Sequence, residues 1–224
     1  MKRRYLFQFI LIFLGSLLYF MANVQRVSVP GSIFDVLQRD LMANPASITA
    51  LGASFMYLYA FSQLVMGFFI SKYGGYRILS IGAIIFVIGS LLFPFSKTLG
   101  LLYLSRGLVG LGSSTFYLSI IHELKNITSQ KNFGLIVSIC LVIGYIGSIL
   151  AAAPLVLCVN EIGWRSLFVI LGIITAIIAI LFILFKFAIP KPKIDKNIKL
   201  NFDLYKNILL KKENIYLYIF GCIN

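Results

Sequence analysis

The sequence predicts an all-α membrane protein whose main part is a bundle of six transmembrane helices. Hydrophobic residues make up 60% of the 224 residues and charged residues only 12%, and the mean hydropathy is +0.96. Six apolar runs approach or exceed the roughly 20 residues that a helix needs to cross a hydrocarbon core. Because so few charges cannot cover the core of a soluble domain of this size, we expect lipid to cover the bundle.

The first apolar run extends from about Tyr5 to Val24 and can continue as helix to Leu37. Its basic start, from Lys2 to Arg4, is also typical of a cleaved signal peptide. However, the apolar part is longer than the roughly 7–15 residues of a signal-peptide core, and no small-x-small cleavage site follows before Asn23. We therefore expect this run to be retained as a spanning helix.

Five further runs complete the predicted bundle, which occupies residues 1–187. They extend over about Ile48–Ile70, Ile78–Phe95, Leu99–Ile121, Phe133–Leu157 and Trp164–Phe187. Pro190 and Pro192 end the sixth helix, and a basic cytoplasmic linker is expected over residues 188–214. Within it, Phe202–Leu210 is either an amphipathic helix on the membrane surface or part of a solvated linker.

A seventh apolar run begins at Ile215, and residues 215–224 are too few to cross a membrane. We expect this segment to be the start of a truncated seventh helix, in a truncated or split reading frame.

The positions of lysine and arginine predict the orientation of the bundle, because cytoplasmic loops are rich in both. An amino terminus in the cytoplasm places fifteen of the twenty on the inner side. Those are Lys2, Arg3, Arg4, Lys72, Arg77, Lys125, Lys131 and eight lysines from Lys186 to Lys212. We therefore expect a multi-pass protein of the inner (plasma) membrane. The net charge of +13 belongs to these loops, so nucleic acid is not an expected partner.

Neither a metal site nor an enzyme active site is visible in the sequence. Cys140, Cys158 and Cys222 lie far apart and form no CxxC pair. There is no HExxH motif and no pair of carboxylates within a span. We expect no cofactor, no metal and no catalytic residues.

A glycine-containing basic loop joins the second and third runs. It contains Gly67, Ser71, Lys72, Gly74 and Arg77. Glycine permits a tight turn at position 74 and a close helix approach at position 67, while the cations favour the cytoplasmic face. The loop resembles the G-x-x-x-D-R/K-x-G-x-R/K-R/K signature of the major facilitator superfamily, in which it acts as a conformational latch. Ser71 stands where that signature has an acid, which weakens the expected latch.

Three further segments resemble the same superfamily in the same order. Arg106, Gly110 and Gly112 match its R-x-x-x-G-x-G pattern in the fourth helix. Gly144, Gly147 and Pro154 form a loose version of its fifth-helix motif, and Gly163-Trp164-Arg165 precedes the sixth helix as it does in the family. The glycines are expected to bring helix backbones together.

The resemblance implies the amino-terminal six-helix half of a secondary transporter. In that family two halves rock around a site near the membrane midplane, so this half is expected to act with a second half-transporter chain or as a homodimer. The alternative is a membrane interaction or assembly protein derived from such a half. Lipid and a small solute are the expected partners.

Arg26, near the end of the first run, resembles the first-helix arginine of anion:cation symporters, which implies an organic-anion solute. It is either a cavity residue or an outer interfacial arginine. Arg106 either faces the bundle interior or extends to the outer surface. Tyr59 and Gln63 share a helix face, which is either a binding surface or a packed aromatic stripe. These four are the predicted substrate-binding residues. No carboxylate lies clearly inside a span, so no proton carrier is evident.

Overall fold

The computed structural model describes residues 2–188, which are helical almost throughout and contain no strand. The elements are α1 (Lys2–Ser28), the 3-10 turn η1 (Gly31–Ile33), α2 (Phe34–Leu41), α3 (Pro45–Tyr73), α4 (Gly75–Phe95), α5 (Leu99–Ser113), α6 (Phe116–Ile127), α7 (Gln130–Leu150), α8 (Ala153–Ile162) and α9 (Trp164–Phe187). The predicted linker after Ala188, its segment 202–210 and the truncated seventh helix over 215–224 lie outside the described residues.

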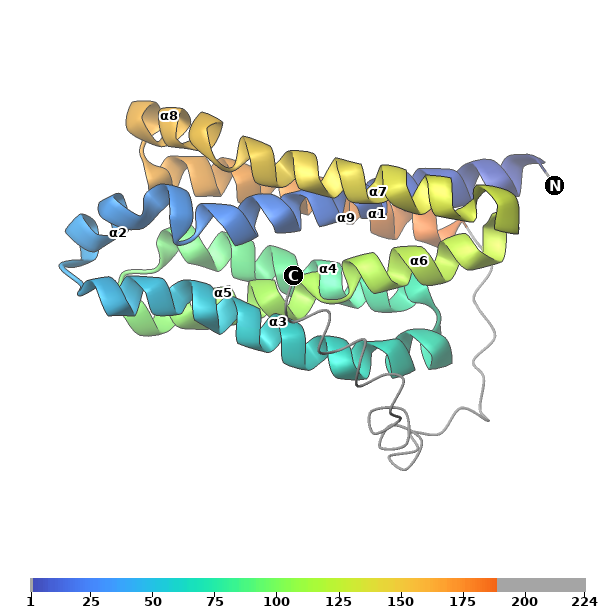
Figure 1. Ribbon diagram of the computed structural model, residues 1–224, viewed down its shortest axis with the longest axis horizontal. Helices are drawn as coiled ribbons and strands as arrows, with labels where there is room; N and C mark the ends of the chain where they lie inside the picture. Colours follow the sequence, from blue (N-terminus) through green and yellow to red (C-terminus); the bar gives the residue numbers. More distant parts are fainter. Residues whose placement is uncertain (1, 189–224) are drawn as a thin grey trace. The chain divides into compact units, whose positions relative to one another are not determined.

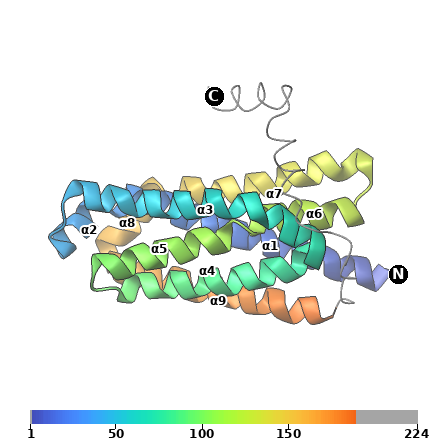
Figure 2. The same cartoon turned by 90° about the horizontal axis from the view of Figure 1, so that it is seen from below.

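Five of the described helices are long and apolar enough to span a membrane: Leu6–Ser28 within α1, and all of α3, α4, α7 and α9. The fourth predicted run differs because it consists of two helices, α5 and α6. Figures 1 and 2 show these two helices following one another along the bundle. Together they take the place of the fourth predicted crossing.

The break between α5 and α6 has a local cause in three consecutive hydroxyl residues. Ser113, Ser114 and Thr115 each donate a side-chain hydrogen bond to the carbonyl oxygen three residues earlier, over 2.7–3.0 Å. Such bonds compete with the helix ladder and bend or interrupt it. The prediction of one continuous helix over 99–121 was therefore wrong in this detail.

The fifth predicted run, over 133–157, is also divided. It begins earlier, with α7 at Gln130, and breaks at Ala151 and Ala152 before α8. Pro154 lies in the first turn of α8, where its missing N–H is tolerated. The same residue inside a continuous helix would clash with the preceding turn, which explains the break.

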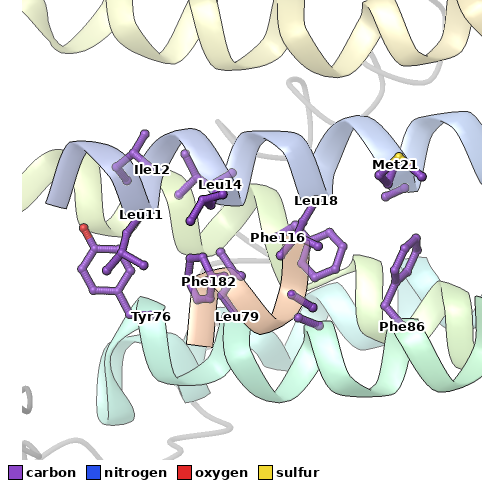
Figure 3. Packing of buried hydrophobic residues seen from close by; sticks show 14 of the residues in the cluster. Leu11, Ile12, Leu14, Leu18, Met21, Tyr76, Leu79, Phe86, Phe116 and Phe182 are labelled. Atoms are coloured by element: carbon purple, nitrogen blue, oxygen red, sulfur yellow. The ribbon is translucent and has the colours of Figure 1, made fainter. Parts of the chain in front are cut away.

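Helices α1 and α4 each bury more residues than any other described helix. Helix α1 packs against α6, α7 and α9, and α4 packs against α5, α6 and α9. Figure 3 shows the main contact, in which Leu11, Leu14 and Leu18 of α1 meet side chains from three other helices. Those partners are Tyr76 and Leu79 of α4, Phe116 of α6 and Phe182 of α9. Burial of these apolar groups positions α1 for the site described below.

Glycines set the closest helix approaches. A Cβ atom added at Gly110 would lie 2.5 Å from the Phe55 carbonyl oxygen of α3, and one at Gly112 would lie 2.6 Å from the Gly82 carbonyl oxygen of α4. On α7, a Cβ at Gly147 would lie 2.5 Å from the Phe20 carbonyl oxygen of α1. At Gly67 it would meet nothing within 4 Å, so the close approach expected there is not found among the described residues.

The outer faces of α3, α7 and α9 are apolar and uncovered. Large hydrophobic side chains are exposed along each of them, including Phe61 and Leu64 of α3 and Leu135 and Ile149 of α7. Water cannot solvate such faces favourably over the length of a helix. The fold is therefore that of a protein embedded in a lipid bilayer.

Candidate functional site

A small open pocket lies among α1, α3 and α5. Its lining residues are Tyr19, Ala22, Asn23 and Arg26 of α1, Phe55 and Tyr59 of α3, and Ser113 of α5. Tyr59 is the central residue of the 29-residue helix α3, and Ser113 is the last residue of α5 before the break in the fourth crossing. The pocket thus lies at mid-length of α3 and of the crossing formed by α5 and α6, and in the second half of α1.

Arg26 is the charged group of this pocket. Its side chain is half-buried, and no hydrogen bond or ion pair joins it to any residue in the described part of the chain. No carboxylate lines the pocket. Because an arginine presents five N–H donors in a planar fork, this guanidinium is available to an anion.

Tyr59 and Gln63 are brought together, but only Tyr59 lines the pocket. Gln63 lies one turn further along α3, and its Nε2 donates a hydrogen bond to the Tyr59 hydroxyl over 2.8 Å. The Tyr59 ring also stacks on Phe55, with centroids 5.7 Å apart and 12° between the planes. Both neighbours hold the Tyr59 side chain in one orientation.

Arg106 has a different environment, because it faces the interior of the bundle and does not line the pocket. Its side chain is 1% exposed. Nη1 donates to the Gln25 carbonyl oxygen over 3.1 Å, and Nη2 donates to the Val29 carbonyl oxygen over 3.3 Å. The guanidinium also lies over the Phe55 ring, 4.8 Å from its centroid.

The two carbonyl groups bound by Arg106 lie in the last turn of α1 and just beyond it. A helix ends with carbonyl groups that lack partners within the helix and that carry its negative dipole end. Arg106 satisfies two of these acceptors where water has no access, since Gln25 and Val29 are themselves buried. The Arg106 guanidinium therefore holds the end of α1, the helix that bears Arg26, against α5.

Several lining residues escaped the sequence analysis, although a signal for them existed. Tyr19, Asn23 and Arg26 follow one another at spacings of four and three, which places them on one face of α1. Phe55, Tyr59 and Gln63 follow the same rule on α3. Helical spacing from each predicted site residue would have found them, but nothing local indicates that the two faces meet.

The basic loop lies at the end of the bundle where α3 passes into α4. Gly74 has φ of 87°, which a side chain would strain. Lys72 and Arg77 both lie over the Tyr73 ring, at 5.4 and 5.7 Å from its centroid. The Ser71 hydroxyl donates to the Gly67 carbonyl oxygen over 2.9 Å, so it is used within α3.

A carboxylate from another helix reaches this loop. Glu123 of α6 is 9% exposed, and its Oε1 accepts a hydrogen bond from the Tyr76 backbone N–H over 3.2 Å. A Cβ at Gly75 would lie 2.8 Å from that oxygen. Glu123 is thus buried and stabilises the first turn of α4, where negative charge is favourable.

Metal binding has no support among residues 2–188, where no group of three or more His, Cys, Asp or Glu side chains gathers. Cys140 and Cys158 are both free thiols.

Comparison with known proteins connects this geometry to one family. The sequence profile described as Major Facilitator Superfamily matches residues 3–223. Among curated relatives, the chloroplastic sodium-dependent phosphate transport protein 1 of Arabidopsis thaliana is 25% identical over 175 residues, which cover 74% of this chain and 32% of that protein. The riboflavin transporter RibZ of Clostridioides difficile is 26% identical, over 79% of this chain and 39% of that protein.

A third relative, the probable sulfoacetate transporter SauU of Cupriavidus necator, is 20% identical, over 78% of this chain and 40% of that protein. The chain therefore spans about a third to two fifths of the length of these relatives. The crystal structure of a bacterial homolog of the human lysosomal transporter Spinster matches 92% of this chain and 50% of its own chain, with a TM-score of 0.65 and 16% identity.

Proposed function

This chain belongs to the major facilitator superfamily, and we propose that it forms the amino-terminal half of a secondary transporter for a small organic anion. The observation that carries the proposal is the Arg26 guanidinium, unpaired among the described residues, in a pocket among α1, α3 and α5. A half-buried guanidinium without a partner among the described residues keeps its N–H donors free for an anionic solute. The names of two relatives, a phosphate and a sulfoacetate transporter, agree with an anionic solute.

The proposed roles of the four predicted site residues follow from their positions. Arg26 binds the anionic group of the solute, and Tyr59 contacts the solute beside it. Gln63 acts through Tyr59, and Arg106 acts through the end of α1. Arg106 and Gln63 are thus positioning residues, because neither lines the pocket.

Alternating access in this fold needs two bundles that rock around a central site, and residues 2–188 form one. We propose that a second bundle covers the open pocket, either from a second half-transporter chain or from a second copy of this one. The basic loop would then act as the latch between conformations. The amino terminus and this loop are proposed to face the cytoplasm, in the inner (plasma) membrane, because lysine and arginine gather on that side.

An equilibrium binding measurement tests the proposed site. The purified 224-residue chain in lipid nanodiscs is titrated with benzoate, succinate and inorganic phosphate in a calorimeter. We expect at least one of the three anions to bind, and Arg26→Gln to weaken that binding at least tenfold. Arg39→Gln is the matched control, since Arg39 is exposed on α2, away from the pocket. If none of the three binds, or if Arg26→Gln binds as well as the parent chain, the proposal is wrong.

A second measurement addresses transport itself. Uptake of the bound anion into proteoliposomes is compared for the chain alone and for the chain co-reconstituted with a candidate second bundle. We expect uptake in at least one arm, and we expect Arg26→Gln to abolish it. Binding without uptake in either arm would favour the alternative, a membrane interaction or assembly protein.

A further inference from the structure

The contact between α4 and α9 has differently charged ends. Where α4 finishes and α9 begins, Arg165 of α9 donates to the Pro94 and Ser96 carbonyl oxygens over 2.8 and 3.0 Å. A cation and two carbonyl groups therefore hold the two helices together at that end. At the opposite end, where α4 begins and α9 finishes, each helix contributes a cation, Arg77 from α4 and Lys186 from α9.

Arg77 and Lys186 lie close to one another across this contact. The Tyr76 ring packs against the Phe182 ring, with centroids 6.3 Å apart (Figure 3). Arg77 follows Tyr76 directly, and Lys186 lies one turn beyond Phe182 on α9. The two positive charges are near enough to act on one another. Because both lie near the ends of spanning helices, they are at the depth of the lipid headgroups.

Neither cation has a carboxylate partner among residues 2–188. Arg77 is exposed, and its guanidinium lies over the Tyr73 ring, 5.7 Å from the centroid. This stacking uses the face of the guanidinium and leaves its N–H edge available. Lys186 is half-buried beside a like charge, which costs free energy. An anion bound between the two helices would remove that cost.

An apolar surface begins directly beside Arg77. Ile81, Ile84 and Ile88 follow it along α4 at spacings of four, three and four residues, which places all four on one helix face. The three isoleucines are exposed, as expected of a face that meets acyl chains. A ligand that fits this surface has an anionic head at Arg77 and an apolar tail along α4.

We propose that Arg77 and Lys186 bind the phosphate group of an acidic phospholipid, whose acyl chains lie along the exposed face of α4. Inorganic phosphate shares the anionic group but has nothing to cover the isoleucines. A phosphatidylcholine shares the acyl chains, but its choline group brings a third positive charge to the pair. The inference does not depend on the anion site of Arg26, since neither Arg77 nor Lys186 lines that pocket.

Native mass spectrometry measures the lipid preference. The purified 224-residue chain in a non-ionic detergent is titrated with dioleoylphosphatidylglycerol or dioleoylphosphatidylcholine, which carry the same acyl chains. We expect the first phosphatidylglycerol to bind at least tenfold more tightly than phosphatidylcholine, because each nearby cation contributes about fivefold. Equal affinities for the two lipids overturn the inference, and a carboxylate from residues 189–224 would then be the expected partner of the two cations.

Single substitutions test whether these two cations cause the preference. Arg77→Gln and Lys186→Gln should each reduce the preference for phosphatidylglycerol about fivefold. Lys131→Gln is the matched control, because it removes one positive charge from an exposed side chain in the first turn of α7, a helix that packs mainly against α1. It should change the preference less than twofold. If it reduces the preference as much as Arg77→Gln does, the cause is the overall charge and the inference is wrong.

A conservative variant protects the test against misfolding. Arg77→Lys keeps the charge and loses the planar fork, so it should retain the preference for phosphatidylglycerol within about threefold. Unchanged affinity for phosphatidylcholine shows that each variant is folded. A preference that disappears in Arg77→Lys, although the charge is kept, overturns the role of the cation pair.

Thermal unfolding separates a lipid from a free anion as the ligand. Phosphatidylglycerol should raise the unfolding midpoint of the chain in detergent more than phosphatidylcholine does, because a ligand that binds the folded state stabilises it. Inorganic phosphate at the same concentration should leave the midpoint unchanged. Stabilisation by inorganic phosphate as large as that by phosphatidylglycerol would mean that the anion alone is recognised, and the proposed lipid site would be wrong.

Discussion

Arg26 of α1 and Arg106 of α5 are both arginines in membrane-crossing helices, but their guanidinium groups have opposite surroundings. Arg26 is half-exposed in an open pocket and has no partner among the described residues. Arg106 is buried, donates to two carbonyl groups and lies over an aromatic ring.

This difference separates two uses of a charge within a membrane. A buried guanidinium that donates to two backbone carbonyl groups stabilises the fold. One whose donors are free can bind a solute. Arg106 is 81 and 77 residues from the two residues whose carbonyl groups it binds, yet those carbonyl groups lie at the end of the helix that bears Arg26. The following predictions test this division, from the largest expected effect to the smallest.

Arg106→Ala should destabilise the protein by about 3 kcal/mol. It leaves the buried Val29 carbonyl group without its donor and the Gln25 carbonyl group with only the long bond from the Ser28 hydroxyl, at 3.5 Å. Each lost bond costs roughly 1–3 kcal/mol, and relief of the desolvated charge offsets part of this. Unfolding of the purified chain by denaturant in mixed micelles measures the change. Arg26→Ala is the control and should shift stability by less than about 0.5 kcal/mol, as is usual for a partly exposed side chain. Equal destabilisation by both substitutions would contradict the division.

Arg26→Ala should instead weaken binding of an organic anion by about 10–100-fold. Hydrogen bonds to charged groups contribute roughly 1.5–3 kcal/mol, which corresponds to this range. Calorimetry on the chain in nanodiscs measures it. Arg26→Lys should retain part of the affinity, since a lysine keeps the charge and loses the planar fork. Full affinity in the alanine variant would show that the anion binds elsewhere.

Gly144→Ala should disturb the pocket of Arg26 without touching Arg106. The new Cβ would lie 2.2 Å from Cε1 of the Tyr19 ring, so the ring must move, with an overpacking cost of about 1–3 kcal/mol. Anion affinity should fall several-fold. Gly134→Ala is the matched control on the same helix, because its Cβ meets nothing within 4 Å. That variant should be neutral or up to about 1 kcal/mol more stable.

Gln63→Leu should have the smallest effect, a loss of anion affinity of about threefold to tenfold. It removes the hydrogen bond that orients the Tyr59 hydroxyl, worth roughly 0.5–1.5 kcal/mol. Because Gln63 acts through Tyr59, the same substitution should have almost no effect in a Tyr59→Phe background. Additive effects in the double variant would mean that Gln63 contacts the solute directly.

The sequence predicted the membrane fold and four of its six crossings with accurate helix type and approximate bounds. It was wrong about continuity in the fourth and fifth runs, for reasons that are local but easily overlooked. Three adjacent hydroxyl residues interrupt the fourth, and Pro154 divides the fifth. Hydropathy does not report these breaks, because all the residues involved are compatible with an apolar segment.

The candidate site was predicted only in part. Arg26 and Tyr59 were identified and do line one pocket, whereas Phe55, Tyr19 and Ser113 were not identified. The loop glycine at position 74 was correctly expected at a tight turn, since its positive φ is a local property. The contact between Glu123 and the Tyr76 N–H was not predicted, because the two residues are 47 positions apart in the sequence.

The amino-acid sequence alone determined that this protein enters a lipid bilayer, about how often it crosses and where its chain turns. These properties depend on the transfer of each segment from water to lipid and on local backbone geometry, so neighbouring residues suffice to set them. Only the tertiary structure decided that Arg106 donates to the carbonyl groups at the end of α1 and that Arg26 lines a pocket without a partner among the described residues. That depends on the rotation of each helix about its axis and on contacts between distant residues, neither of which hydropathy or spacing contains.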